Sequence, residues 1–265
     1  KRNNCSKLKG DVSSVFQKLN LISKVEVNED ELACIDTEDT WTATQFDESQ
    51  REAMVRSLTR RVSIIQGPPG TGKSLVGSEI VRIMLENRER LSGKLAPPVL
   101  VICQTNSALD QFLEILLKFT SKIIRIGSRS MSYKLESHNL SALKNHISQN
   151  LLRKQAFYEQ EQGLLSEINS LKSSLKDSAQ INKEDLSRLV DMKGRLQHLR
   201  RVEEASLCRK ADILGMTVTG AAKHRELLEF VKPGLVMVEE AGEILEAHLV
   251  AALPTSAKQL VMIGD

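Results

Sequence analysis

The sequence of 265 residues predicts a doubly wound α/β domain with a parallel sheet, because short apolar runs alternate with helical patterns. The runs are rich in Val and Ile and nearly continuous, as expected for strands buried on both faces of a parallel sheet. Between them, residues 74–86, 108–119 and 240–253 place apolar side chains three and four positions apart, which predicts helices. The expected strands are Val62–Gln66, Val99–Gln104, Lys122–Ile126, Ile213–Thr217, Leu235–Glu239 and Leu260–Gly264.

The composition is that of a globular protein and leaves its function open. The 37 Lys and Arg residues against 34 Asp and Glu give a net charge of +3, too small to indicate a nucleic-acid partner. No apolar run reaches the roughly 18 residues of a membrane-spanning helix, and no secretion signal opens the chain, so we expect an intracellular, cytoplasmic protein. The four cysteines are widely separated, which argues against a zinc site or a disulfide framework.

The first segment, residues 1–45, has scattered apolar positions and an acidic middle, and we interpret it as a lead-in segment or the end of an accessory domain. The chain lacks an initiator Met and stops at an apolar run, so we expect a fragment of a larger protein. Just after this segment, Gln50 has two interpretations of equal weight. Its amide can recognise adenine, or it can close a capping box with Asp47 at the start of a helix.

The strongest motif follows the first predicted strand. Residues 67–74, GPPGTGKS, match G-x-x-x-x-G-K-[ST] between a strand and a helix, the context that a phosphate-binding P-loop requires. Lys73 is expected to reach the β- and γ-phosphates of ATP, and the Ser74 hydroxyl to bind Mg²⁺. The predicted phosphate-binding residues are Gly67, Pro68, Pro69, Gly70, Thr71, Gly72, Lys73 and Ser74.

An acidic pair ends the strand at residues 235–239. Four apolar residues carry this strand to the carboxyl edge of the sheet, where ligands bind in open α/β folds. We assign Glu239 to the Mg²⁺ and Glu240 to activation of the attacking water, so that Glu240 and Lys73 are the candidate catalytic residues. The competing interpretation is a pair of Glu residues that favours the start of a helix.

The alternation of strands and helices is interrupted by an insertion at residues 128–210. Two heptad seams predict an antiparallel helical hairpin, a coiled-coil arm, with Asn182 as a possible N-cap of its second helix. The arm carries 15 Lys or Arg against 10 Asp or Glu, which suits contact with phosphates and equally a solvated surface. Residues 46–127 and 211–265 then form the nucleotide domain. The seam residues are Leu164, Ile168, Leu171 and Leu175, and Leu189, Met192, Leu196 and Leu199.

The motifs taken as a set resemble a known family. FDESQ, QGPPGTGKS, VICQTNSALDQ, RIGSRS, ILGMTVTGA, VEEAGE and VMIGD occur in this order over roughly residues 44–265. They resemble the first RecA-like domain of superfamily 1 helicases of the nonsense-mediated-decay type, and most of all the NFX-type zinc-finger-containing helicase-like proteins. The resemblance implies a RecA-like P-loop NTPase fold.

The resemblance also implies functions that spacing does not reveal. Gln50 would recognise adenine, and the helical insertion would face RNA. Single-stranded RNA would be the partner, with DNA possible, together with a second RecA-like domain and zinc fingers elsewhere in the parent chain. It further implies a role in RNA silencing or antiviral RNA surveillance, in the cytoplasm, the nucleus or RNA granules. The residues implied to contact the nucleic-acid backbone are Thr105, Asn106, Thr217 and Thr219, for which helix capping is the competing interpretation.

Two positions depart from the family pattern. Glu239 stands where most relatives have Asp, and its extra methylene displaces the carboxylate by about one bond at a site where Mg²⁺ demands near-octahedral geometry. Glu243 stands where relatives often have Gln. The second RecA-like domain, which supplies arginines to the γ-phosphate, is absent from this chain, so we expect the fragment to bind ATP but to hydrolyse it poorly.

Three functional hypotheses follow. The first is the ATP-binding half of an ATP-dependent RNA helicase motor that couples hydrolysis to RNA binding or remodelling. The second is a nucleotide-gated RNA-binding clamp or scaffold with little hydrolysis. The departures at Glu239 and Glu243 are the observations that support this hypothesis. The third is a DNA helicase of the same superfamily. Polarity of movement, duplex unwinding and RNA specificity leave no mark in the sequence.

Overall fold

The fold is centred on a parallel sheet of six strands. The computed structural model describes residues 46–87, 97–127, 130–147, 151–177 and 183–265. The strands run in the order β1-β6-β5-β2-β4-β3, and every pairing is parallel. All six predicted strands are confirmed, with ends that shift by at most one residue. They are β1 (Val62–Gln66), β2 (Val99–Cys103), β3 (Ile123–Arg125), β4 (Ile213–Thr217), β5 (Leu235–Glu239) and β6 (Gln259–Gly264).

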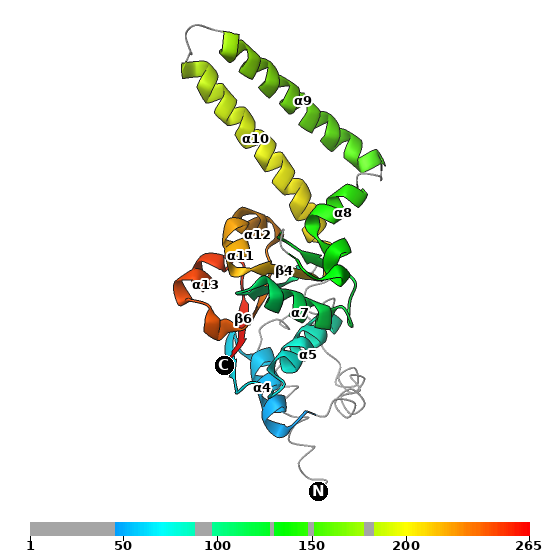
Figure 1. Ribbon diagram of the computed structural model, residues 1–265, viewed down its shortest axis with the longest axis vertical. Helices are drawn as coiled ribbons and strands as arrows, with labels where there is room; N and C mark the ends of the chain where they lie inside the picture. The colour runs from blue at the N-terminus through cyan, green and yellow to red at the C-terminus, as the bar shows by residue number, and fades with distance from the viewer. Residues whose placement is uncertain (1–45, 88–96, 128–129, 148–150, 178–182) are drawn as a thin grey trace, which may run out of the picture.

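Helices cover the two faces of the sheet (Figure 1). Along each strand, alternate side chains enter two separate cores, as the period of two in a strand requires. One core lies beneath α4 (Glu48–Thr59), α5 (Lys73–Glu86) and α7 (Asn106–Leu116). The opposite core is covered by α11 (Val218–Lys223), α12 (Arg225–Val231) and α13 (Glu246–Ala252). The predicted α/β class is confirmed.

One helix prediction is wrong. The pattern over residues 240–253 predicted a single helix, but the chain makes a 3-10 turn, η2 (Ala241–Glu243), before α13 begins. Glu240 has a φ of +56°, in the left-handed region, and Ile244 and Leu245 are extended. A left-handed residue cannot continue a right-handed helix, so the chain bends directly after β5.

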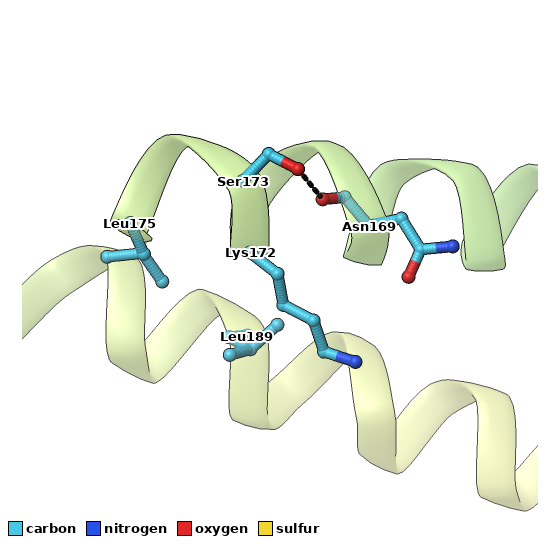
Figure 2. A pocket seen from close by; sticks show the side chains of 5 residues that line it. All are labelled: Asn169, Lys172, Ser173, Leu175 and Leu189. Carbon is cyan, nitrogen blue, oxygen red and sulfur yellow. Dashed lines mark hydrogen bonds between the residues drawn. The ribbon is translucent and has the colours of Figure 1, made fainter. Parts of the chain in front are cut away.

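The insertion forms a long antiparallel pair of helices, α9 (Leu151–Asp177) and α10 (Lys183–Cys208), that projects from the α/β body (Figure 1). Ile168, Met192 and Leu196 are buried between the helices, as the predicted seams require. Toward the tip, Figure 2 shows Leu175 and Leu189 between the helices, with Lys172 extending toward α10 across a shallow depression. The predicted N-cap Asn182 lies outside the described residues.

The two ends of the insertion pack against the body. Residues 133–138 form a 3-10 turn, η1 (Tyr133–His138), whose Leu135 is fully buried in the core beneath α7. After the next helix, α8 (Leu140–Ile147), the chain enters the arm. At its base, α10 contributes Ala205 and Cys208 to the opposite core. The rings of His198 and Phe230, the latter in α12, pack edge to face with their centroids 5.6 Å apart. No described helix is both long and apolar enough to span a bilayer.

Candidate nucleotide and nucleic-acid site

The P-loop lies at the carboxyl end of β1 and leads directly into α5. Gly70 and Gly72 have φ values of +83° and +76°, a conformation in which a β-carbon is strongly disfavoured. Gly72 is the N-cap of α5 and has no side chain to accept from the first turn. The N–H groups of that turn are therefore available to an anion, and the helix dipole adds positive potential at the same point.

The Lys73 ammonium group is held against the loop. Its Nζ donates to the carbonyl oxygens of Gly67 at 2.6 Å and Pro68 at 2.8 Å. It also lies 2.5 Å from the Asp265 carboxylate at the end of β6. Because all three partners are oxygen atoms, phosphate oxygens can replace them without a change in the chemistry of the contact.

Ser74 and Glu239 form the second part of the site. Glu239 ends β5 and faces the same side of the sheet as α5, so its Oε1 accepts a hydrogen bond from Ser74 Oγ in the first turn of that helix. The Glu239 side chain is buried, and its Oε2 has no hydrogen-bond partner among the described residues. The pKa of Glu239 is raised from its ordinary 4.5 to about 6, mainly by burial and also by the nearby Glu240, against the lowering effects of the Ser74 hydrogen bond and Lys73.

This arrangement fits a hard divalent cation bound together with phosphates. A hydroxyl and a carboxylate are in contact, and one buried carboxylate oxygen lacks a partner. Mg²⁺ is normally held by one or two carboxylates and completes its shell with water and substrate phosphates. Among the residues that the structure describes, no group of three or more His, Cys, Asp and Glu side chains is placed to hold a metal alone.

Glu240 lies beyond the end of the strand and is exposed. Its left-handed backbone turns the chain away from β5 before η2. Partial burial raises the pKa of its carboxyl group, and the nearby carboxylates of Glu243 and Asp265 raise it further. A carboxylate with a raised pKa is a stronger proton acceptor than a free one.

Gln50 lies against the P-loop. Its Oε1 accepts from the Asp47 backbone N–H at 3.0 Å, and Asp47 accepts from the Gln50 N–H, so the capping box at the start of α4 is present. The Gln50 Nε2 donates to the Thr71 carbonyl at 3.0 Å. The capping interpretation is thus confirmed. The same side chain also reaches the phosphate loop, and recognition of adenine stays a prediction.

The four residues implied to contact nucleic acid lie at the same edge of the sheet. Thr105 follows β2 and caps α7 by accepting from the Ala108 N–H at 3.1 Å. Thr217 ends β4, the neighbouring strand, and caps α11 by accepting from the Gly220 N–H at 3.2 Å. The capping roles are therefore present, Thr219 Oγ1 lies 3.3 Å from Thr217 Oγ1, and Asn106 begins α7.

The sequence did not single out Asp265 or Arg125, although both lie at this edge. Asp265 directly follows the carboxyl end of a strand, and this position could have identified it as a candidate site residue. Arg125 stands within the apolar run KIIRI and is fully buried. A charged residue inside a strand of this kind signals a buried, paired charge, because Arg is almost never fully buried alone.

Comparison with known proteins identifies the family. Residues 45–265 match the family model described as AAA domain, which covers most of the chain. The chain belongs to this family. It is a nucleotide-binding, RecA-like P-loop domain of the superfamily 1 helicase type, in agreement with the parallel sheet and the position of the P-loop.

Several curated proteins are similar to this AAA domain. It is 47% identical over 105 residues to NFX1-type zinc finger-containing protein 1 of Homo sapiens, covering 39% of this chain and 6% of that protein. It is 30% identical to Regulator of nonsense transcripts 1 of Dictyostelium discoideum, covering 83% of this chain and 15% of that protein. For Helicase required for RNAi-mediated heterochromatin assembly 1 of Schizosaccharomyces pombe, the identity is 24%, over 83% of this chain and 37% of that protein.

The AAA domain thus spans between 6% and 37% of the length of these three relatives. Among solved structures, the UvsW helicase from bacteriophage T4 is similar with a TM-score of 0.44 and 13% identity, covering 91% of this chain and 62% of that chain.

Proposed function

We propose that this domain is the ATP-binding half of an ATP-dependent RNA helicase motor that couples ATP hydrolysis to RNA binding or remodelling. The observation that carries the proposal is the contact between Ser74 and the buried Glu239, beside the uncapped start of α5. A P-loop hydroxyl in contact with a carboxylate at the end of a strand suits the binding of a Mg²⁺-nucleotide. The pairing of strands in the sheet does not require this contact. The names of the relatives, a regulator of nonsense transcripts and a helicase required for RNAi-mediated heterochromatin assembly, favour RNA as the partner.

In this proposal, the P-loop binds the phosphates of ATP. The N–H groups at the start of α5 donate to them, and Lys73 exchanges the carbonyls of Gly67 and Pro68 for phosphate oxygens. Ser74 and Glu239 would hold Mg²⁺, which neutralises charge on the phosphates when it is bound. Gln50, whose Nε2 already reaches Thr71, would recognise adenine at the rim of the loop.

Glu240 would orient the attacking water and accept its proton. It directly follows Glu239, the proposed ligand of the metal, and its raised pKa suits a general base. Efficient hydrolysis would need arginines from a second RecA-like domain, since such residues contribute about 10³ to 10⁵ in turnover.

The nucleic acid would cross the edge of the sheet formed by β2 and β4. Thr105, Asn106, Thr217 and Thr219 begin helices there, and the partner would be single-stranded RNA held by its backbone. The helical arm with its positive excess would extend this surface as a coiled coil. The cytoplasm is the proposed location and RNA silencing or antiviral RNA surveillance the proposed process, with zinc fingers in the parent chain.

The test is ATP turnover by the full-length protein with and without single-stranded RNA or DNA. We expect RNA to stimulate turnover, Glu240→Gln to abolish turnover while retaining ATP binding, and Lys73→Ala to weaken ATP affinity by at least about 10- to 100-fold. Gln50→Ala, which changes a side chain of α4 that contacts the same loop, should weaken ATP affinity less than Lys73→Ala. Undiminished turnover in Glu240→Gln would refute the general-base assignment.

Two outcomes would favour the alternative functions. RNA binding that responds to ATP without measurable turnover would indicate a nucleotide-gated clamp. The displaced carboxylate of Glu239 would account for the lack of turnover, because Mg²⁺ demands near-octahedral geometry. Stimulation by DNA alone would indicate a DNA helicase of the same superfamily. Retained ATP affinity in Lys73→Ala would overturn the nucleotide site itself.

A further inference from the structure

Arg125 forms a buried network that the nucleotide site does not use. The residue ends β3, and its side chain is fully buried beneath α7. Nε donates to Asp110 Oδ1 at 2.6 Å, and Nη2 donates to Asn106 Oδ1 at 2.8 Å. Nη1 donates to the Gly127 carbonyl at 3.2 Å. The guanidinium group therefore joins the end of β3 to the first two turns of α7 through two contacts, and a third contact goes to the Gly127 carbonyl just beyond the strand.

Asp110 extends the network to the chain beyond β3. Its Oδ1 pairs with Arg125, while its Oδ2 accepts from Ser130 Oγ and from the Met131 N–H, both at 3.0 Å. Gly127 has a φ of +140°, so its carbonyl reaches Arg125 through a backbone conformation that other residues rarely adopt. The buried ion pair thereby has partners for both charges, which is the condition for keeping such a pair inside a protein.

The contact with Asn106 decides how its amide is oriented. A guanidinium group has donors only, so the atom that meets Arg125 must be the amide oxygen. The Nδ2 of Asn106 is left as the free end of the amide, and it donates to no residue that the structure describes. Asn106 is partly exposed at the sheet edge, between Thr105 and the body of α7. It therefore offers a fixed hydrogen-bond donor to a ligand, and that ligand must supply an acceptor.

A phosphodiester oxygen matches this donor. It is an acceptor only, it is charged, and a backbone of such groups passing the ends of β2 and β4 would meet Thr105, Asn106 and Thr217 in turn. A donor whose orientation is already fixed loses little conformational freedom on binding, which improves affinity. An ion pair that served only to fasten α7 to β3 would need Asp110 alone and would leave the amide of Asn106 free to flip.

We propose that Arg125 is a positioning residue for nucleic-acid binding, which holds the Asn106 amide with its Nδ2 toward a phosphodiester oxygen of the bound strand. The inference rests on the proposed function, because it deepens the contact of this edge with single-stranded RNA. Asp110 supports Arg125 and connects it to Ser130 and Met131.

The primary test variant is Asn106→Asp in the full-length protein. It keeps an oxygen for Arg125 to bind and places an acidic residue in the first turn of α7, so folding is preserved. The donor toward the phosphate becomes a carboxylate oxygen, and we expect the Kd for single-stranded RNA to rise by about 10- to 100-fold. The melting temperature and the affinity for an ATP analogue without RNA should not change.

The second variant is Arg125→Lys, which keeps the buried charge near Asp110 but cannot hold Asn106 at the same time. We expect a rise of about 3- to 10-fold in the RNA Kd and in the KM for RNA in RNA-stimulated turnover, with kcat at saturating RNA within about 2-fold. Arg82→Lys is the matched control, since Arg82 also pairs with a carboxylate, that of Glu79 within α5. The control should bind RNA as the unmodified protein does.

The outcomes separate this inference from the proposed function. Unchanged RNA affinity in a folded Asn106→Asp variant would overturn the inference while leaving the helicase proposal intact. If Arg125→Lys fails to fold, Asn106→Asp still decides. Failure of the unmodified protein to bind RNA, at salt concentrations down to about 50 mM, would overturn the proposed function and with it the inference.

Discussion

Replacing Glu239 with Gln is expected to stabilise the protein at neutral pH when no metal or nucleotide is bound. The Glu239 side chain is buried, with a relative exposure of 5%, and its pKa is raised from 4.5 to about 6. When the pKa of a carboxyl group is higher in the folded state than in the unfolded state, ionisation of that group destabilises the folded protein. The resulting penalty is fully present above about pH 6 and is relieved as the pH falls from 6 toward 4.5.

The magnitude follows from that shift. A difference of about 1.5 pKa units corresponds to about 2 kcal/mol of unfolding free energy, at roughly 1.4 kcal/mol per unit. Gln has nearly the same shape as Glu and keeps an oxygen for Ser74, so the substitution removes the charge and leaves the packing. We therefore expect Glu239→Gln to raise the unfolding free energy by up to about 2 kcal/mol at pH 8 and by less than about 1 kcal/mol at pH 5.

The assay is urea denaturation at pH 8 and pH 5 without Mg²⁺ or nucleotide. Glu243→Gln, which removes an exposed carboxylate in η2 just beyond β5, is the control and should change stability by less than about 0.5 kcal/mol. The added stability should come with loss of Mg²⁺-dependent ATP binding, as is common where a strained site serves function. Equal stability changes at the two pH values, or a loss of stability at pH 8, would refute the argument.

Two further predictions concern the metal and the arm. Mg²⁺-dependent ATP affinity should weaken as the pH falls through about 6, because protonated Glu239 cannot bind the cation; a flat affinity profile between pH 7.5 and 5 would contradict this. The arm can be shortened by deleting residues 162–199 and joining Glu161 to Arg200, since Arg200 Nε and Glu161 Oε1 form an ion pair across the arm at 2.6 Å. This deletion should leave ATP affinity unchanged and weaken RNA binding. RNA affinity equal to that of the intact chain would assign the arm a structural or protein-binding role.

Local patterns in the sequence predicted most of the framework. Apolar runs without alternation identified all six strands, because a strand covered on both faces has no polar side to show. The P-loop could be recognised because its glycines and Lys73 are required by local backbone geometry, which a short segment determines without help from the rest of the chain. The arm followed from heptad spacing, since two helices that pack along their length need the same repeat throughout.

The prediction of one helix over residues 240–253 shows where local patterns stop being sufficient. The spacing of apolar residues there suits a helix, but the chain must turn from the end of β5 toward η2 at the sheet edge. Glu240 accordingly adopts a left-handed conformation. That requirement comes from the neighbouring strands and leaves no trace in the periodicity of the segment itself.

The sequence by itself determined which residues form strands and that an acidic pair ends the strand at residues 235–239, and it predicted where phosphates would bind, because each of these depends on residues adjacent in the chain. Only the tertiary structure decided that Glu239 is buried against Ser74, that Lys73 meets Asp265, and that Arg125 orients Asn106. These contacts join residues 19 to 192 positions apart. They arise from strand order and helix packing, which bring distant segments to one edge of the sheet, and no local pattern encodes that meeting.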